Sequence, residues 1–243
     1  MPSSSESSSS PAFTTPLDSA VSEMHEEGRV IEPHSHPKPP GAAFPHFLER
    51  DVEDVSLARV IESARPVPTE WSLQTWRWIV VRTPAARKYL EAATSLKAPL
   101  SSAPVILICL ADSQAWKSAP LFLQEMIASR KITAEESHDA LRRLRDRYTA
   151  SPEIANRSAL ANAYVAVHQV LMGAAESSLS AYWVAEFDEA KIKNHFHIPD
   201  HFLVAALLPV GYTEEAPAPH PSRFPARAFI YKEKFGQGLE PAP

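Results

Sequence analysis

The segment 157–178, RSALANAYVAVHQVLMGAAESS, has small or apolar residues on nearly every side of a helix. A helix of this kind cannot rest on a solvated surface with one face in water, so it needs neighbours on more than one side. We therefore expect either a central helix of the fold or a helix at an oligomer interface. Whatever the chain folds into must cover this segment.

A second constraint is the apolar run 103–111, APVILICLA, which contains the single cysteine of the chain, Cys109. A continuous apolar run of this length is typical of a strand that is covered on both faces. Cys109 is therefore expected to be a buried thiol in a reducing compartment. Because there is one cysteine, neither an internal disulfide nor a cysteine-based metal site can form.

Periodicity predicts the remaining elements. Residues 51–65 carry apolar side chains at nearly helical spacing, with Asp51 or Asp54 as the N-terminal cap. Three more strands are expected at 77–81, 181–187 and 201–212. Three more helical segments are expected at 84–94, 115–148 and 188–199, the second of which is highly charged.

The two ends of the chain differ in composition from the middle. Residues 1–40 are rich in serine and proline and lack the basic and apolar regions of a signal peptide. We expect them to be a disordered tail and lead-in. Residues 41–243 are expected to form one domain. Its last part, 213–243, is an extended proline-rich arm with too little apolar content to fold by itself, so it should lie across another surface.

Composition excludes several classes of function. The chain has 6 glycines and 23 prolines, and no glycine-rich phosphate loop occurs in it. A net charge of −5 provides no basic field for nucleic acid, and no apolar run is long enough for a membrane span. His34 and His36 have no third ligand nearby, so no metal site is expected. Together with the single buried thiol, these features lead us to expect a cytoplasmic protein.

The segment 68–81, PTEWSLQTWRWIVV, places polar residues between large rings directly before a predicted strand. A polar loop that runs into a core strand can hold a planar ligand with hydrogen-bonding edges. The residues alone also allow an ordinary surface loop in which Trp71 and Trp76 are anchored in the core.

Four pieces of the chain, in order, resemble the FMN-dependent nitroreductase family. The segment 64–81 is similar to the family pattern AR-x-x-P-S-x-x-N-x-Q-P-W-R-F-V-V-V. It matches at Ala64, Arg65, Pro68, Gln74, Trp76 and Arg77. The segment 161–212 is similar to the long dimer helix of the family, its E-G-F-D strand end and the strand that follows. PSRFPARAFIYKEKFG (221–236) resembles the terminal pattern of the family.

This resemblance implies an α+β, nitroreductase-like fold in which helices wrap a central, mostly antiparallel sheet. Family members are intertwined homodimers with two FMN sites at the subunit interface. The arm 213–243 would cross to the partner, and the apolar helix would lie in the dimer interface. The charged segment, taken as 115–150, would be a helical lid over the flavin.

The resemblance also implies the activity of an FMN-dependent oxidoreductase with NAD(P)H as co-substrate. Hydride would pass by a ping-pong mechanism from NAD(P)H through flavin N5 to a small acceptor, such as a nitroaromatic compound or a quinone. No catalytic side chain is required, because the cofactor carries the chemistry. The expected partners are a second copy of the chain and a small-molecule substrate, without nucleic acid or membrane.

The family motifs also imply binding residues. Hydroxyl and amide groups of the loop before the first strand would hydrogen-bond the flavin. The residues implied for cofactor binding are Thr69, Glu70, Ser72, Gln74, Lys97, Val184, Ala185, Glu186 and Arg223. Trp116 and Phe122 could stack on the acceptor, or they could simply pack between helices.

The sequence departs from the family pattern at the expected phosphate site. The family opens with R-R-S-x-R-x-F, whereas the equivalent stretch here is GAAFPHF, with Gly41 and Ala43 in place of the arginine and the serine. Arg223 retains the C-terminal phosphate arginine of the family. Lys38 and Lys97 are the nearest substitute cations.

Other departures leave the function open at this point. Glu186 stands where the family usually has a glycine that offers its N–H to flavin N5. A non-catalytic relative that binds flavin, another flat ligand or nothing would fit these changes. A subclass that uses reduced flavin and oxygen to fragment the flavin itself is a further alternative.

Overall fold

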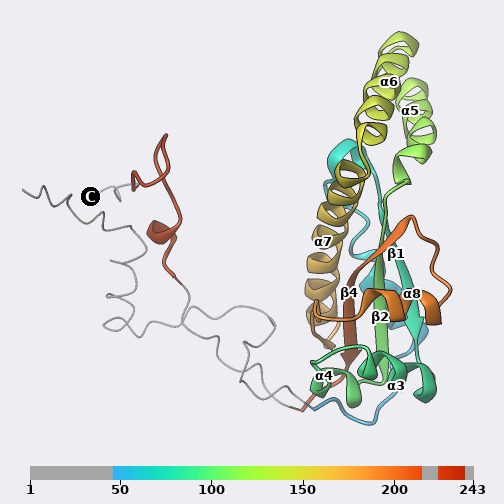
Figure 1. Cartoon of the computed structure of the whole chain (residues 1–243), viewed down its shortest axis with the longest axis vertical. Coiled ribbons are helices and arrows are strands. Elements are labelled where there is room, and N and C mark those ends of the chain that lie inside the picture. Colours follow the sequence, from blue (N-terminus) through green and yellow to red (C-terminus); the bar gives the residue numbers. More distant parts are fainter. Residues whose placement is uncertain (1–45, 215–223, 239–243) are drawn as a thin grey trace, which may run out of the picture. The chain divides into compact units, whose positions relative to one another are not determined.

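The computed structural model describes residues 46–214 and 224–238. Within them lies an antiparallel sheet with the strand order β1-β2-β4-β3 (Figure 1). The strands are β1 (Trp76–Val81), β2 (Val105–Asp112), β3 (Ser180–Ala181) and β4 (Phe202–Gly211). Helices pack against both faces of this sheet, which confirms the predicted α+β fold around a central antiparallel sheet.

Every residue of β2 is buried, as predicted for a strand covered on both faces. Successive side chains of a strand point to opposite faces, so β2 contributes to two separate cores. Leu107 and Cys109 belong to the first core, and Ile106 and Ile108 belong to the second. The Cys109 thiol is free, and burial raises its pKa, so the thiol stays protonated and unreactive.

Helices α2 (Asp54–Glu62) and α7 (Pro152–Glu176) cover the first face. α7 begins where the Ser151 hydroxyl accepts a hydrogen bond from the Ile154 N–H and Pro152 takes the first helical position. The small side chains along its inner side allow close packing on the sheet and on α2. They include the buried alanines 159, 163, 166 and 174. The predicted central helix is therefore α7.

Another side of α7 is partly exposed in the described part of the chain. Tyr164 and Val165 are 38% and 44% exposed, and His168 on the same side is also exposed. Within one chain α7 packs both on the sheet and on α2, so the predicted need for neighbours on more than one side is met there, while part of the helix stays exposed. This exposed strip of Tyr164, Val165 and His168 is called the outer face of α7 below.

Three shorter helices cover the second face. They are α3 (Pro84–Ala92), α4 (Ala98–Ser101) and α8 (Glu189–His195). Leu90, Leu100 and Ile192 are the fully buried anchors of these helices in the second core. α8 begins where the Asp188 carboxylate accepts a hydrogen bond from the Lys191 N–H. These helices correspond to the predicted segments 84–94 and 188–199, with α4 added.

The charged segment between β2 and α7 is helical, as predicted. It consists of η2 (Ala115–Ser118), α5 (Ala119–Ala128) and α6 (Ala134–Ala150). α6 begins with a reciprocal capping box, in which Thr133 and Glu136 each accept the other's backbone N–H. α5 and α6 lie side by side beyond one end of the sheet (Figure 1). Whether they act as a lid stays a prediction.

The strand expected at 181–187 is shorter than its sequence suggests. After Ala181 the chain makes one isolated bridge, Val184 to Leu207, and then leaves the sheet. The hydroxyl of Thr94 donates to the carbonyl of Glu186, which draws the segment toward the end of α3. A contact with a residue far away in the sequence therefore ends this strand.

The predicted cap of the first helix is also different. Glu53 occupies the cap position of α2 and makes no side-chain hydrogen bond there. Asp51 and Asp54 instead bind the guanidinium of Arg82, at 2.9 and 2.6 Å. Arg82 follows the end of β1, so the two acids attach the lead-in to the sheet rather than capping the helix.

Residues 224–238 belong to a different compact unit from 46–214 and are described by themselves. They contain η3 (Ala226–Ala228) and a bridge between Tyr231 and Gly238. The rings of Tyr231 and Phe235 lie 4.5 Å apart. Phe224, Phe229 and Phe235 are exposed. The predicted tail 1–40 and Arg223 lie outside the described residues.

Candidate functional site

The loop 69–75 enters β1 in an unusual conformation. Residues Glu70–Ser72 form the turn η1, in which Trp71 and Ser72 have φ angles of 58° and 53°. For residues other than glycine this left-handed region costs about 1–2 kcal/mol each. The turn leaves Trp71 37% exposed and also exposes Ser72. Strained backbone of this kind collects at functional sites, where surrounding contacts hold it in place.

Hydrogen bonds to α7 hold this loop. Thr75 Oγ1 donates to the carbonyl of Ala159 at 2.9 Å, and the Glu70 N–H donates to Asn162 Oδ1 at 3.3 Å. Ser158 Oγ donates to Glu70 Oε2 at 2.7 Å. Ser158 and Asn162 lie four residues apart, on the same side of the helix, and both are buried. α7 therefore positions the loop that precedes β1.

The carboxylate of Glu70 also reaches the end of α6. Its Oε1 pairs with Arg147 Nη2 at 3.0 Å, and Tyr148 is hydrogen-bonded to Ser158 and lies 3.4 Å from Glu70 Oε2. Burial raises the pKa of the Tyr148 phenol, the Ser158 hydrogen bond opposes this, and Glu70 adds to the rise. The phenol stays protonated at neutral pH and can donate. Glu70 thus uses its polar groups within the chain.

Glu186 lies on the other side of the sheet from this loop, against the end of α3. Ser95 Oγ donates to its carboxylate Oε1, and Thr94 donates to its carbonyl. Nothing in the described part of the chain accepts a hydrogen bond from the Glu186 N–H. The side chain is thus held toward Ser95, while the backbone donor is available to a ligand.

The other predicted residues of this second group differ in exposure. Val184 is buried and paired with Leu207, whereas Ala185 is exposed beside Glu186. Lys97 is exposed and occupies the residue before α4. The predicted site residues therefore form two groups. The loop group is Thr69, Glu70, Ser72 and Gln74, and the edge group is Lys97, Val184, Ala185 and Glu186.

Several donors in these groups have no acceptor among residues 46–214 and 224–238. Thr69 Oγ1, Ser72 Oγ and Lys97 Nζ make no hydrogen bond there, and Gln74 Nε2 has one long contact of 3.5 Å to the Arg65 carbonyl. Asn162 is 6% exposed, and its Nδ2 is also without an acceptor. An unsatisfied buried donor costs about 1–3 kcal/mol. This donor set fits a flat ligand with polar edges.

Trp116 and Phe122, which could stack on the acceptor, are both half-buried and less accessible to a ligand than Trp71 and Ser72. Trp116 is half-buried against the cluster formed by Leu73, Leu144 and Tyr148, so the alternative of helix packing describes it within one chain. Phe122 is half-buried on α5. Sequence reasoning did not identify Ser158 and Asn162 as site residues, because no motif marks a serine and an asparagine within an apolar helix.

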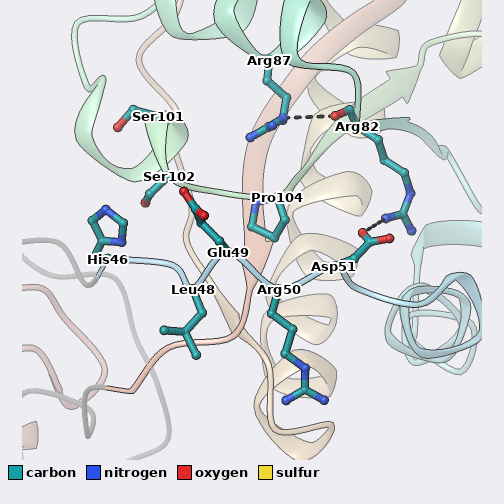
Figure 2. Close-up of a pocket in the computed structure, with 10 residues that line it drawn as sticks. All are labelled: His46, Leu48, Glu49, Arg50, Asp51, Arg82, Arg87, Ser101, Ser102 and Pro104. Atoms are coloured by element: carbon teal, nitrogen blue, oxygen red, sulfur yellow. Dashed lines mark hydrogen bonds and ion pairs between the residues drawn. The ribbon is translucent and has the colours of Figure 1, made fainter.

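A cavity of about 660 Å³ lies at the opposite end of β1 from the loop (Figure 2). At 3.3 Å per residue, β1 separates the two by roughly 17 Å. The cavity is lined by His46, Leu48, Glu49, Arg50, Asp51, Arg82, Arg87, Ser101, Ser102 and Pro104. None of the predicted site residues is among them.

The charged groups around this cavity are already engaged by the protein. Arg82 pairs with Asp51, Arg87 donates to the carbonyls of Arg82 and Ala103, and Arg50 lies over the ring of Tyr212. The Glu49 carboxylate also faces this space (Figure 2). We therefore assign the candidate site to the two predicted groups and not to the cavity.

Two classes of feature are absent from the described ranges. No group of three or more histidine, cysteine, aspartate or glutamate residues in 46–214 and 224–238 could hold a metal ion. In the same ranges no helix has both the length and the apolar character needed to cross a membrane.

Comparison with known proteins gives matches over most of the described chain. The model of the nitroreductase family matches residues 46–212. A Thermus thermophilus protein named NADH dehydrogenase is 27% identical over 70% of this chain and 81% of its own length. The Bacillus subtilis protein YodC, named as an NAD(P)H nitroreductase, is 24% identical over 70% of this chain and 83% of its own length.

Solved structures support the same fold. A protein from Exiguobacterium sibiricum, described as a nitroreductase and crystallised in complex with FMN, is 14% identical to this chain. The match has a TM-score of 0.67 and covers 87% of this chain and 96% of the other. A nitroreductase family protein from Streptococcus pneumoniae matches with a TM-score of 0.66 over 79% of this chain. At sequence identities this low, the structural matches establish a shared fold alone.

Proposed function

The chain belongs to the nitroreductase family, whose model matches residues 46–212, and on that premise we propose that it is an FMN-dependent NAD(P)H oxidoreductase. The observation that carries this proposal is the set of unpaired donors in the loop and edge groups. When bound, FMN supplies hydride transfer at N5, from NAD(P)H and then to a small acceptor such as a nitroaromatic compound or a quinone.

The residues of this chain have the tasks of binding, orienting and tuning. The hydroxyls of Thr69 and Ser72 and the amide of Gln74 would hydrogen-bond the polar edges of the flavin. The N–H of Glu186 would face N5, with its carboxylate held aside by Ser95. Lys97 would supply positive charge at the phosphate end.

The positions of the two groups support a homodimer as the active form. The loop group is attached to α7, which covers the first face of the sheet, and the edge group is attached to α3, which covers the second. One flavin would contact both groups if each came from a different copy of the chain. The outer face of α7 and the exposed phenylalanines of the arm would then be covered in the interface.

We expect the wild-type protein to be a dimer at low micromolar concentration, and Val165→Glu to shift it to monomer. Val165 is 44% exposed on α7, so a carboxylate there is solvated in the monomer but buried in the dimer. Sedimentation velocity measures the change, and circular dichroism checks that the variant is folded. A wild type that sediments as a monomer would refute the dimer.

The purified protein is expected to be yellow, with the absorbance of oxidised flavin, or to become so when FMN is added. Anaerobic addition of NADH or NADPH should bleach this absorbance, and a nitroaromatic compound or quinone should then restore it. A protein that stays colourless with excess FMN would refute the proposal in favour of a non-catalytic relative. Products of flavin breakdown after aeration would instead indicate the flavin-fragmenting subclass.

A further inference from the structure

We propose that Glu70 is a positioning residue, which holds the loop 69–75 so that Trp71 and Ser72 keep their positive φ angles and are presented to the flavin. This inference rests on the proposed function. It differs from the role that the family motif implies for this position, which is direct contact with the cofactor. The evidence is where the polar groups of Glu70 point.

The contacts of Glu70 join the loop to two helices. Its N–H donates to Asn162 Oδ1 and its Oε2 accepts from Ser158 Oγ, both on α7. Its Oε1 pairs with Arg147 at the end of α6. The carbonyl of Glu70 accepts the N–H of Leu73 and closes the turn. Because the N–H, the carbonyl and both carboxylate oxygens of Glu70 already have partners within the chain, these contacts hold the loop and leave few polar groups of Glu70 for a ligand.

The backbone conformation that Glu70 holds is unfavourable without contacts from the rest of the fold. Trp71 and Ser72 are consecutive non-glycine residues with positive φ, and a bulky residue in this region needs surrounding contacts to keep it there. Both residues point away from the core, since both are exposed. Glu70 and its contacts with α6 and α7, called the Glu70 clamp below, lie immediately before these two residues in sequence and fix the start of the strained turn.

The chemistry of the Glu70 clamp also explains why the residue is a glutamate. Two carboxylate oxygens can accept from Ser158 and pair with Arg147 at the same time. Tyr148 and Ser158 are buried, so their hydroxyls need an acceptor that the fold itself supplies. Glutamine would keep one acceptor oxygen and lose the charge, whereas alanine would remove both.

The test compares Glu70→Ala, Glu70→Gln and the matched control Glu135→Ala, which removes an exposed carboxylate from the first turn of α6. Each flavin-free protein is titrated with FMN and with riboflavin, and amide hydrogen exchange is followed in the loop 69–75 and in β2. We expect Glu70→Ala to weaken the binding of FMN and of riboflavin about tenfold and to an equal extent, because in the proposed site the loop contacts the flavin ring and not the phosphate.

Exchange in the loop should rise about tenfold in Glu70→Ala while exchange in β2 is unchanged, and Glu70→Gln should recover most of both effects. Unchanged flavin affinity and unchanged loop exchange would overturn the proposal. An equal rise of exchange in β2 would also overturn it, since Glu70 would then serve general stability. If the wild type binds neither flavin, the proposed function fails, and the loop exchange still decides whether Glu70 holds the loop.

Discussion

Gly173→Ala is expected to lower the free energy of unfolding by about 2–3 kcal/mol, although alanine favours a helix by about 1 kcal/mol over glycine. A Cβ at this position of α7 would overlap Ser63 Oγ and would lie 2.8 Å from Ser63 Cβ. Rotation of the Ser63 side chain can move Oγ but not Cβ. α2 would therefore have to move away from α7, and urea denaturation would measure the loss.

The control for this prediction removes the obstacle. In Gly173→Ala with Ser63→Gly, both clashing atoms are gone, so the double variant should be less destabilised than the sum of the two single variants. Ser63→Gly alone has a cost of its own, because the Ser63 hydroxyl bonds the carbonyls of Val60 and Gln169. A Gly173→Ala variant as stable as the wild type would contradict the close helix contact.

Arg223→Ala is expected to weaken FMN binding by on the order of 2–4 kcal/mol, or roughly 30- to 1000-fold. Arg223 lies outside the described residues, and the expectation rests on its match to the family's phosphate arginine. Gly41 and Ala43 stand where the family has its other phosphate ligands, so Arg223 should carry more of the affinity. A guanidinium can grip two phosphate oxygens, and Arg223→Lys should recover only part of the loss.

Flavin fluorescence titrations with FMN and riboflavin would test this prediction. Riboflavin has no phosphate and should bind the wild type and Arg223→Ala almost equally. Arg59→Ala, which removes an exposed arginine from α2, is the matched control and should leave both affinities unchanged. Equal losses for both flavins would mean that the variant damages the fold. No loss for FMN would assign the phosphate to another cation, such as Lys97.

The candidate site was predictable in part. The family motif implies that Thr69, Ser72 and Gln74 contact the flavin, which stays a prediction. The three residues lie in one loop, where the hydroxyls of Thr69 and Ser72 have no partner in the described part of the chain and Gln74 has one long contact. The role of Glu70 was not predictable, since its partners Tyr148 and Ser158 are 78 and 88 positions away in the sequence. A motif records residue types over a short stretch and carries no information about which distant side chain will accept or donate.

By itself, the sequence determined the main elements, because they depend on patterns within a few residues. The apolar run at 103–111 is enough to predict the buried strand β2, and the residue patterns at 84–94 and 188–199 are enough to predict α3 and α8. The tertiary structure alone decided where β3 ends, which side of α7 faces the sheet and what Glu70 binds. Each of these is set by contacts between segments far apart in the chain, whose geometry exists only once the sheet and its helices have packed.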